Sequence, residues 1–301
     1  MIVITGAAGF IGCNLIRALN ELNYNHLIAV DKFDNELKNS NLEGTKLLAT
    51  IDRNAFIPWA KENAEAIEFI FHLGARTDTT EMDLQLLRQL NTEYSKSIWK
   101  LCVAEQIPLI YASSAATYGN GELGFSDDEA LIPQLKPLNP YAVSKQEFDL
   151  WALAEERKPF FWSGLKFFNV YGPYEQHKGK MASMIHQCYL QIQETGKVKL
   201  FKSYKEGIAH GEQKRDFIHV DDVVDTLIKL MHHRKNSGIY NLGSGKAKTF
   251  NEMVRQVFAS LNLEPQIEYI EMPEGLKERY QYVTEADLTS LKTIPVIPQL
   301  F

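Results

Sequence analysis

The sequence has few cysteines, no long apolar run and no dense block of basic residues. Its three cysteines are odd in number and lie far apart at Cys13, Cys102 and Cys188, which argues against a disulfide framework and against cysteine metal ligands. No apolar stretch is long enough to cross a bilayer, and a formal net charge of −6 argues against a general nucleic-acid partner. We therefore predict no metal site, no membrane segment and no nucleic-acid partner.

The composition is otherwise that of an ordinary globular protein. The 301 residues are 45% hydrophobic and 23% charged, enough for a substantial core in one large domain or two fused ones. The chain opens at once with Met1-Ile-Val-Ile-Thr5, a predicted strand that leaves no room for a signal peptide. These features predict a cytoplasmic protein.

Short apolar segments alternate with longer amphipathic ones in the first half of the chain, the pattern of a parallel sheet wrapped by helices. Beyond residue 169 prolines, glycines and short segments predominate. We expect helices at 12–23 and 93–105, and strands at 2–5, 27–31, 69–73, 109–113, 164–168, 216–220 and 238–242. With right-handed crossovers this pattern predicts an α/β fold, a Rossmann-like doubly wound parallel sheet. We assign residues 1–168 and 212–243 to a dinucleotide-binding domain, and 169–211 and 244–301 to a smaller α/β substrate-binding domain.

A glycine-rich loop follows the first strand and opens the first helix. Gly6, Gly9 and Gly12 carry no side chains, so the backbone can approach a pyrophosphate whose charge meets the helix N-terminus. Asp31 closes the second strand, where an acidic residue usually takes the ribose hydroxyls, and this favours NAD. Lys32 and Lys38 lie close by in the sequence and could balance a 2′-phosphate instead. A weaker expectation places Asp52, at the end of a further strand, against adenine.

Tyr141 and Lys145 are four residues apart and so lie on one face of a helix. An ammonium close to the phenol favours its ionised form, so we expect Lys145 to lower the pKa of Tyr141 and make it a usable base. Ser114 ends a predicted strand, at the sheet edge where ligands bind in open α/β folds. It could hydrogen-bond the reacting oxygen, although serines also cap turns for local reasons. Together with the glycine loop, these residues predict an oxidoreductase-type active site.

These motifs resemble the extended short-chain dehydrogenases that modify nucleotide sugars. Within that group, segments 111–119, 137–145 and 168–183 are similar to the bacterial ADP-glycero-manno-heptose 6-epimerases. The sequence His177-Lys178-Gly179 followed by Met181-Ala-Ser183 narrows the resemblance to this family. The resemblance continues through 214–217, 238–245 and Arg279-Tyr-Gln281, and so covers nearly the whole chain.

The resemblance implies inversion of carbon C6″ of an ADP-linked heptose, used for the inner core of lipopolysaccharide. A carbinol C–H is too weakly acidic for direct deprotonation, so inversion requires oxidation to a ketone by NADP and reduction on the other face. Two faces suggest two acid/base groups. Tyr141 would serve one, and Lys178 resembles the family's second, while Lys145 would hold the nicotinamide ribose. The resemblance also implies a homo-oligomer.

The resemblance further implies which residues contact the two ligands. Besides the three glycines, Lys145 and Lys178, the implied cofactor contacts are Phe10, Ile11, Asp31, Lys32, Lys38, Arg53, Leu73, Gly74, Ala75, Arg76, Thr77, Asn91 and Val170. The implied substrate contacts are Ser114, Asn169, Lys180, Gln187, Phe201, Arg215 and Tyr280. Arg215 could grip a diphosphate with its planar guanidinium, and a salt bridge to Asp216 or Asp221 is the alternative.

The sequence departs from the family pattern at several places near the expected substrate. Lys180 stands where the family often has serine, and Gln187 where a substrate-contacting histidine is expected. The segment 201–213 is longer than the family pattern, and the chain ends at Phe301, before the helix with which such proteins usually end. These departures bear on the identity of the substrate more than on the reaction type.

Three other functions remain open at this point. A UDP-hexose 4-epimerase, or another epimerase of nucleoside-diphosphate sugars, would share the tyrosine, lysine and serine but needs no counterpart to Lys178. A dehydratase usually needs acid and base groups just after the serine, where this chain has Ala115 and Ala116. A dinucleotide-binding regulator without activity would be expected to have lost one of the catalytic residues, and all are present.

Overall fold

The computed structural model describes residues 1–277 and 280–294; Arg279 and Phe301 lie outside the described residues. Its main feature is a seven-stranded sheet in the order β10-β6-β5-β4-β1-β2-β3, with every neighbouring pair parallel. The strands are β1 (Ile2–Thr5), β2 (Leu27–Asp31), β3 (Ala49–Asp52), β4 (Phe69–His72), β5 (Leu109–Ser114), β6 (Trp162–Phe167) and β10 (Gly238–Leu242). Most of these residues are buried, as expected of a parallel sheet covered on both faces. The predicted doubly wound fold is confirmed.

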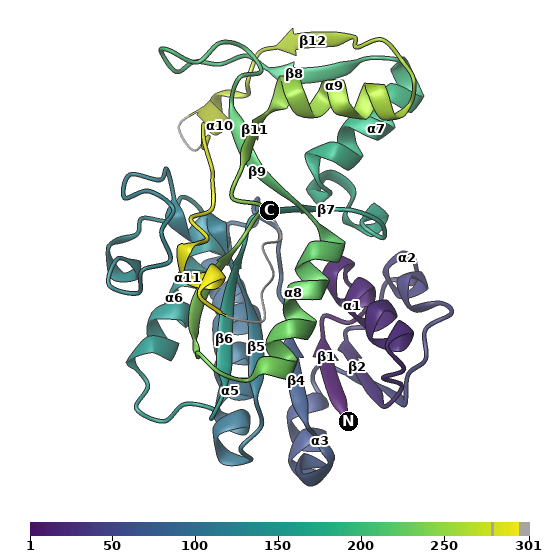
Figure 1. Ribbon diagram of the computed structural model, residues 1–301, viewed down its shortest axis with the longest axis vertical. Coiled ribbons are helices and arrows are strands. Elements are labelled where there is room, and N and C mark those ends of the chain that lie inside the picture. Colours follow the sequence, from purple (N-terminus) through teal and green to yellow (C-terminus); the bar gives the residue numbers. More distant parts are fainter. Residues whose placement is uncertain (278–279, 295–301) are drawn as a thin grey trace.

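Helices cover the two faces of this sheet, with α8 in front of it and α5 behind it in Figure 1. On one face α1 (Phe10–Glu21) packs against α8 (Val220–His233), and on the other α5 (Tyr94–Ala104) contacts α3 (Phe56–Glu62) and α6 (Pro140–Ala154). The start of α6 is locally encoded, because the Asn139 side chain accepts a hydrogen bond from Ala142 N at 2.8 Å and Pro140 occupies the first helical position.

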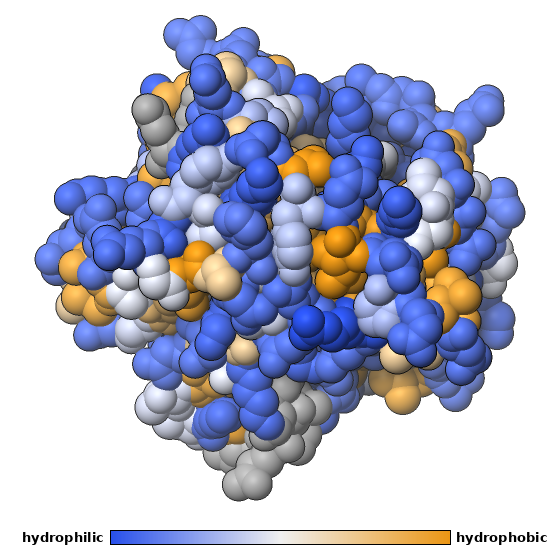
Figure 2. Space-filling model, turned by 90° about the horizontal axis from the view of Figure 1, so that it is seen from above, coloured by the Kyte–Doolittle hydropathy of each residue, from blue (hydrophilic) through white to orange (hydrophobic). Residues whose placement is uncertain are grey.

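A smaller region lies above the carboxyl ends of the main strands (Figure 1). It contains a three-stranded sheet of β11 (Ala247–Thr249), β9 (Lys214–His219) and β7 (Asn169–Tyr171), and a two-stranded sheet of β12 (Ile267–Ile270) and β8 (Val198–Phe201). Helices α7 (Met184–Thr195) and α9 (Phe250–Ser260) pack together there, around a second hydrophobic core that includes Cys188, Val198 and Phe258. Seen from above in Figure 2, the described surface is mostly hydrophilic, and its apolar side chains form small separate patches.

Short helical segments complete the described chain. They are α2 (Glu36–Asn39), η1 (Ser40–Leu42), η2 (Ala64–Ala66), α4 (Leu84–Leu87), η3 (Arg88–Glu93), η4 (Ala115–Tyr118), η5 (Ile132–Gln134), η6 (Gln176–Met181), α10 (Glu274–Lys277) and α11 (Thr289–Lys292). No helix in 1–277 or 280–294 is both long and apolar enough to span a membrane. The same residues contain no cluster of His, Cys, Asp or Glu arranged to hold a metal ion.

At most of their ends, the predicted strands and helices agree with the structure to within two residues. One strand differs in its partners. The segment predicted at 216–220 is β9 (Lys214–His219), and it pairs with β7 and β11 rather than with the main sheet. Our assignment of 212–243 to the dinucleotide-binding domain therefore includes a strand that hydrogen-bonds within the smaller region. The reason is that a sequence pattern reports a strand's burial but not its pairing partner.

Candidate active site

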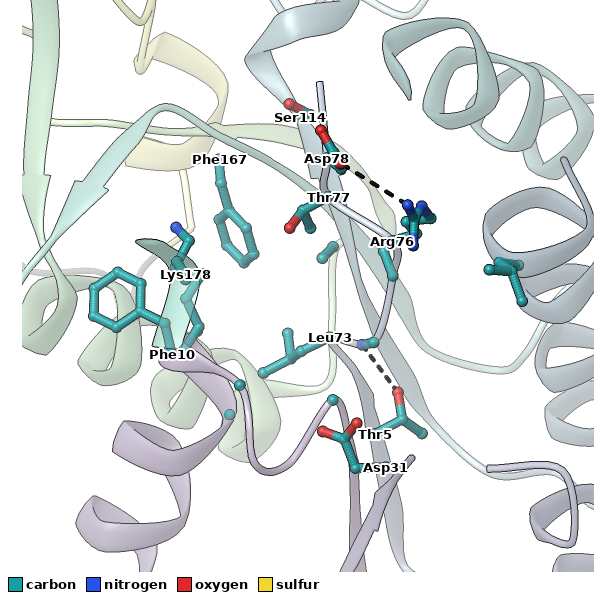
Figure 3. Close-up of a pocket in the computed structure, with 18 of the residues that line it drawn as sticks. Thr5, Phe10, Asp31, Leu73, Arg76, Thr77, Asp78, Ser114, Phe167 and Lys178 are labelled. Carbon is teal, nitrogen blue, oxygen red and sulfur yellow. Dashed lines mark hydrogen bonds and ion pairs between the residues drawn. The ribbon is translucent and has the colours of Figure 1, made fainter. Parts of the chain in front are cut away.

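A cleft of about 630 Å³ opens at the carboxyl edge of the main sheet. Figure 3 shows part of its lining, contributed by the strand ends and the loops that follow them. Nearly every predicted cofactor residue lines this cleft, together with the three candidate catalytic residues Ser114, Tyr141 and Lys178. The cofactor set found there is Gly6, Gly9, Phe10, Ile11, Gly12, Asp31, Lys32, Lys38, Arg53, Leu73, Gly74, Ala75, Arg76, Thr77, Lys145 and Val170.

The glycine loop needs its glycines for space and for backbone conformation. Gly6 has φ +68°, and a Cβ there would lie 2.7 Å from backbone atoms of Gly74. A Cβ on Gly12 would lie 2.3 Å from the Gly6 carbonyl oxygen. Helix α1 therefore starts directly against the strand ends, and the unpaired N–H groups of its first turn are available to an anion in the cleft.

Asp31 already has protein donors on both carboxylate oxygens. Oδ2 accepts from Ala8 N at 3.0 Å, and Oδ1 accepts from Lys32 N at 2.8 Å and from Lys38 Nζ at 2.6 Å. The Asp31 side chain is only 7% exposed, and the Lys38 ammonium balances its charge. The Lys32 ammonium pairs with Asp34 at the rim of the cleft. Asp31 is therefore not a free carboxylate whose two oxygens are both available to ribose hydroxyls.

The adenine contact of Asp52 stays a prediction, and the structure places Asp52 outside the cleft lining. Asp52 does end a strand, β3. Its Oδ1 accepts a hydrogen bond from Asn54 N at 2.8 Å and so stabilises the turn that follows. The neighbouring Arg53 lines the cleft in its place.

Tyr141 and Lys145 lie on the first two turns of α6, beside the end of β5. The Lys145 ammonium donates to the Ala112 carbonyl oxygen at 2.9 Å. A hydrogen bond joins the Tyr141 phenol to the Ser114 side chain. Both α6 side chains are buried, with 8% of Tyr141 and 5% of Lys145 exposed. The three predicted residues therefore meet at one point of the cleft wall.

The expected lowering of the Tyr141 pKa by Lys145 is wrong for this structure. Burial raises the pKa of Tyr141, the Ser114 hydrogen bond opposes that rise, and the Asp149 carboxylate adds to it. Burial also lowers the pKa of Lys145 to about 8. Sequence spacing placed the two groups on one helix face but could not report how strongly burial acts on each of them.

Lys178 reaches the same cleft from η6. Its ammonium lies 5.3 Å from the centroid of the Phe10 ring, and Figure 3 shows it between the rings of Phe10 and Phe167. Burial among these rings lowers the pKa of Lys178, and the Glu175 carboxylate partly opposes that effect. A surface lysine on a turn would keep its ordinary pKa, so this environment is that of an amine able to exchange a proton.

Asn91, like Asp52, is a predicted cofactor residue that does not line the cleft. It is 1% exposed, and its amide accepts from Arg76 N at 2.8 Å while donating to Arg76 O at 3.1 Å and to Ser144 Oγ at 3.0 Å. Asn91 thus links the backbone of Arg76, which lines the cleft, to the Ser144 side chain of α6.

Arg215 lies in the smaller region, outside the cleft lining. Its guanidinium lies over the rings of Phe250 and Tyr280, 5.4 and 5.2 Å from their centroids. It forms no ion pair with any carboxylate of the described residues, so the alternative salt bridge to Asp216 or Asp221 is wrong. Asp216 instead accepts hydrogen bonds from the backbone of Ser244, Gly245 and Ala286, and Asp221 lies beside His219.

Apart from Ser114, the other predicted substrate residues also lie outside the cleft lining. Gln187 donates to the Gly179 carbonyl oxygen at 2.7 Å and so holds the segment that carries Lys178. Asn169 donates to Asp216 O at 3.0 Å, Phe201 accepts at its carbonyl from Gln213 at 3.3 Å, and Lys180 is exposed on η6.

Several cleft residues were not singled out from the sequence. They are Thr5, Val30, Asp34, Asp78, Leu90, Tyr94, Ala112, Ser113, Phe167, Phe168, His177 and Met181. Most directly follow or precede a predicted strand or motif, which is the one sequence signal that could have identified them. Asp78 was the least accessible to such reasoning, because it is placed by a loop and pairs with Arg76 at 3.8 Å (Figure 3).

Comparisons with known proteins agree with this geometry. The sequence pattern of the NAD dependent epimerase/dehydratase family matches residues 2–243. The ADP-L-glycero-D-manno-heptose-6-epimerase of Fusobacterium nucleatum is 46% identical over 98% of this chain and 92% of its own. The crystal structure of the Helicobacter pylori ADP-L-glycero-D-manno-heptose-6-epimerase has a TM-score of 0.82 and is 30% identical, covering 97% of this chain and 89% of that one.

The fold is also shared with enzymes of other specificity. The UDP-N-acetylglucosamine 4-epimerase of Methanobrevibacter ruminantium has a TM-score of 0.82 over 98% of this chain and 91% of its own, at 22% identity. The two heptose epimerases are 46% and 30% identical to this chain, whereas the 4-epimerase with the same TM-score as the second is 22% identical. Sequence identity rather than architecture therefore distinguishes among these relatives.

Proposed function

This chain belongs to the NAD dependent epimerase/dehydratase family and, within it, to the ADP-L-glycero-D-manno-heptose 6-epimerases, and we propose that it inverts C6″ of an ADP-linked heptose with NADP. The observation that carries this proposal is the placement of Tyr141 and Lys178 in one cleft. They come from α6 and η6 and lie beside the predicted dinucleotide residues, with Tyr141 buried and Lys178 half-buried. The product, the L-glycero epimer, would serve lipopolysaccharide inner-core synthesis.

Inversion at this carbon requires oxidation to a ketone and reduction on the opposite face. A bound nicotinamide supplies the reversible hydride acceptor and, when oxidised, a positive charge that favours an ionised phenol nearby. Tyr141 takes the hydroxyl proton of one epimer, and Lys178 takes that of the other, since the sugar presents its oxygen to a different base after it turns. After the sugar turns, the other group must already be protonated and gives its proton to the oxygen, so inversion of the first epimer uses ionised Tyr141 with protonated Lys178. Inversion in the reverse direction uses neutral Lys178 with protonated Tyr141, and a net transfer of one proton between the two groups resets the site.

Ser114 and Lys145 support Tyr141 in this scheme. Ser114 hydrogen-bonds the phenol and opposes the rise in its pKa. Its hydroxyl would also hydrogen-bond the substrate oxygen that loses and regains the proton. Lys145 is anchored on Ala112 O and would hold the nicotinamide ribose with its remaining donors. Both therefore orient Tyr141 and the cofactor rather than transfer the proton themselves.

The choice of NADP over NAD rests on the surroundings of Asp31. Its two oxygens already accept three hydrogen bonds from the protein, one of them from the Lys38 ammonium. A carboxylate neutralised in this way repels a 2′-phosphate less, and Lys32, Lys38 and Arg53 line the same cleft as cations. These contacts support a site for the phosphorylated ribose.

Replacing Lys38 by alanine is expected to raise the Kd for NADP by about 10- to 100-fold, which is the usual effect of losing one charge-assisted hydrogen bond. The change also leaves the Asp31 carboxylate without its ammonium partner beside the 2′-phosphate of NADP. NAD lacks that phosphate, so the Kd for NAD should change far less. Titration of both nucleotides by calorimetry, with Lys46→Ala as an exposed control, measures the ratio. An equal loss for NAD and NADP would contradict the NADP assignment.

Arg215 is the proposed contact for the diphosphate of the nucleotide sugar. Its guanidinium lies over two aromatic rings without a carboxylate partner among the described residues. One donor, Nη1, bonds the Lys214 carbonyl oxygen at 2.8 Å, and the other nitrogens remain available to an anion. A fork of two donors matches a phosphate bidentately, which a lysine cannot do.

The variant Arg215→Lys keeps the charge but loses the fork. It is expected to raise KM for the ADP-heptose by about tenfold or more, with the Kd for NADP unchanged. Steady-state kinetics and a cofactor titration separate the two effects. A raised Kd for NADP with an unchanged KM for the sugar would contradict the proposal, because it would show that Arg215 acts on the cofactor instead of the nucleotide sugar.

The substrate itself is tested by incubating the purified protein with ADP-D-glycero-D-manno-heptose and, in parallel, with UDP-glucose, following each by NMR. Conversion of the heptose alone is expected. Turnover of UDP-glucose instead would support the 4-epimerase alternative and leave Lys178 without a role. The homo-oligomer and the cytoplasmic location implied earlier stay predictions.

A further inference from the structure

Asn41 joins two walls of the cleft without lining it. It lies in η1 and is 6% exposed. Its amide nitrogen lies 2.9 Å from the Ala8 carbonyl oxygen, 3.3 Å from the Tyr174 carbonyl oxygen and 3.0 Å from Nδ1 of His177. One buried amide therefore contacts the glycine loop on one side and the segment before Lys178 on the other.

The direction of these hydrogen bonds follows from their partners. Both carbonyl oxygens can only accept, so the atom that faces them is the amide nitrogen and not its oxygen. The two amide hydrogens are shared among three neighbours, and the 3.0 Å contact with His177 Nδ1 is a hydrogen bond in the tautomer whose Nδ1 is unprotonated. Burial lowers the pKa of His177, and Lys38 and Lys178 lower it further, so the neutral form is the one expected at neutral pH.

Lys178 depends on contacts of this kind because its own segment is irregular. Segment η6 is only six residues long, and it is interrupted by Gly179 at φ +52°. A lysine has four side-chain torsions, so the position of its ammonium is defined only if its backbone is fixed. Gln187 holds the Gly179 carbonyl from one side, and Asn41 holds the residues before Lys178 from the other.

Two further contacts bring the same segments together. Asn14 of α1 donates to the Pro173 carbonyl oxygen at 3.0 Å, and the Arg17 guanidinium lies 4.4 Å from the centroid of the Tyr174 ring. Asn14 also donates to the Phe10 carbonyl oxygen at 2.8 Å, within its own helix, whereas Asn41 reaches Ala8 from the separate segment η1.

We propose that Asn41 is a positioning residue for Lys178: its hydrogen bonds to Ala8, Tyr174 and His177 set the second base against the loop that holds the dinucleotide. The inference rests on the proposed function, in which Lys178 serves one epimer. Removing Asn41 should therefore impair the half-reaction that uses Lys178 and spare the half-reaction that uses Tyr141. Misplacing a reacting group by about 1 Å costs on the order of 100-fold in rate.

The test measures each half-reaction separately. Protein loaded with NADP is mixed rapidly with one epimer of the ADP-heptose at a time, and the initial rate at which reduced nicotinamide absorbs is recorded. Lys178→Met identifies the epimer that depends on Lys178. Asn41→Ala is expected to slow oxidation of that same epimer by about 10- to 100-fold and to leave the other within about threefold.

The chain offers a matched control in Asn20. It also joins α1 to a later loop through two carbonyl oxygens, those of Tyr24 and Lys46, each at 3.0 Å. It makes no hydrogen bond to residues 173–181. Asn20→Ala should therefore act equally on the two epimers. Asn41→Ser, which keeps a polar group at the buried position, serves if Asn41→Ala folds poorly.

Hydrogen exchange supplies a readout that does not depend on activity. The amide of Lys178 bonds Glu175 O at 3.0 Å and that of Ala182 bonds Gly179 O at 3.1 Å. Loss of Asn41 should speed exchange in 173–182, whereas Asn20→Ala should leave this segment protected as before.

The possible results separate the inference from its premise. If Lys178→Met is asymmetric but the Asn41 variants act on the two epimers alike, or not at all, the inference is overturned and the two-base scheme stands. If Lys178→Met itself slows both epimers alike, the two-base scheme fails and the inference fails with it.

Discussion

Tyr141→Phe is expected to lower kcat for epimerisation by about 10²- to 10⁴-fold, the usual contribution of a positioned acid/base group. The substitution removes one oxygen from a side chain that is 8% exposed, so the packing of α6 against β5 is preserved. Both directions of the reaction should suffer, because every complete inversion passes once through the face that Tyr141 serves. The Kd for NADP should change little.

The measurement is the rate of conversion followed by NMR, together with a cofactor titration of the same protein. Tyr24→Phe is the matched control, since it removes a phenolic oxygen that contacts only His232 at the surface. An activity of Tyr141→Phe within tenfold of the unaltered protein would remove Tyr141 from the proposed chemistry.

Lys178→Met should have an effect of similar size, but confined to one epimer. In the half-reaction assay, oxidation of one epimer is expected to fall by about 10²- to 10⁴-fold while oxidation of the other stays within about threefold. The methionine fills the space between Phe10 and Phe167 without supplying a base. The complementary pattern is expected of Tyr141→Phe, which should lose the opposite epimer.

Lys180→Met is the control for charge, because it removes the same ammonium two residues away from an exposed position. Any effect it has should be equal for the two epimers. The pH dependence gives a further check: only the neutral amine accepts a proton, so the Lys178-dependent rate rises with pH. Burial lowers the pKa of Lys178, so this rise should level off below the pH expected of an ordinary lysine. Symmetric loss in Lys178→Met would contradict its role as second base.

The sequence predicted the fold well because each signal is local. Apolar runs such as Leu27–Asp31 report burial on both faces of a sheet. The Gly6 to Gly12 spacing reports a turn that admits no side chain. The Tyr141 to Lys145 spacing reports one helix face. None of these inferences requires knowledge of a distant partner.

The predictions that failed depended on distant partners. The pKa of Tyr141 is raised chiefly by burial, which the spacing of Tyr141 and Lys145 does not report. The alternative salt bridge from Arg215 to Asp216 is not formed among the described residues, where the guanidinium lies over the rings of Phe250 and Tyr280 instead. Asn41 is 136 residues from His177 in the chain, so no local pattern could have joined them. Such contacts belong to the tertiary structure.

The central claim is that C6″ is inverted by hydride leaving and returning within one cleft. The most direct test is to supply ADP-heptose deuterated at C6″ in ordinary water and to examine the epimerised product by NMR. The account predicts that the product keeps its deuterium, because hydride on a nicotinamide does not exchange with water. Replacement of deuterium by solvent hydrogen during inversion would contradict it, and would mean that the carbon loses a proton instead.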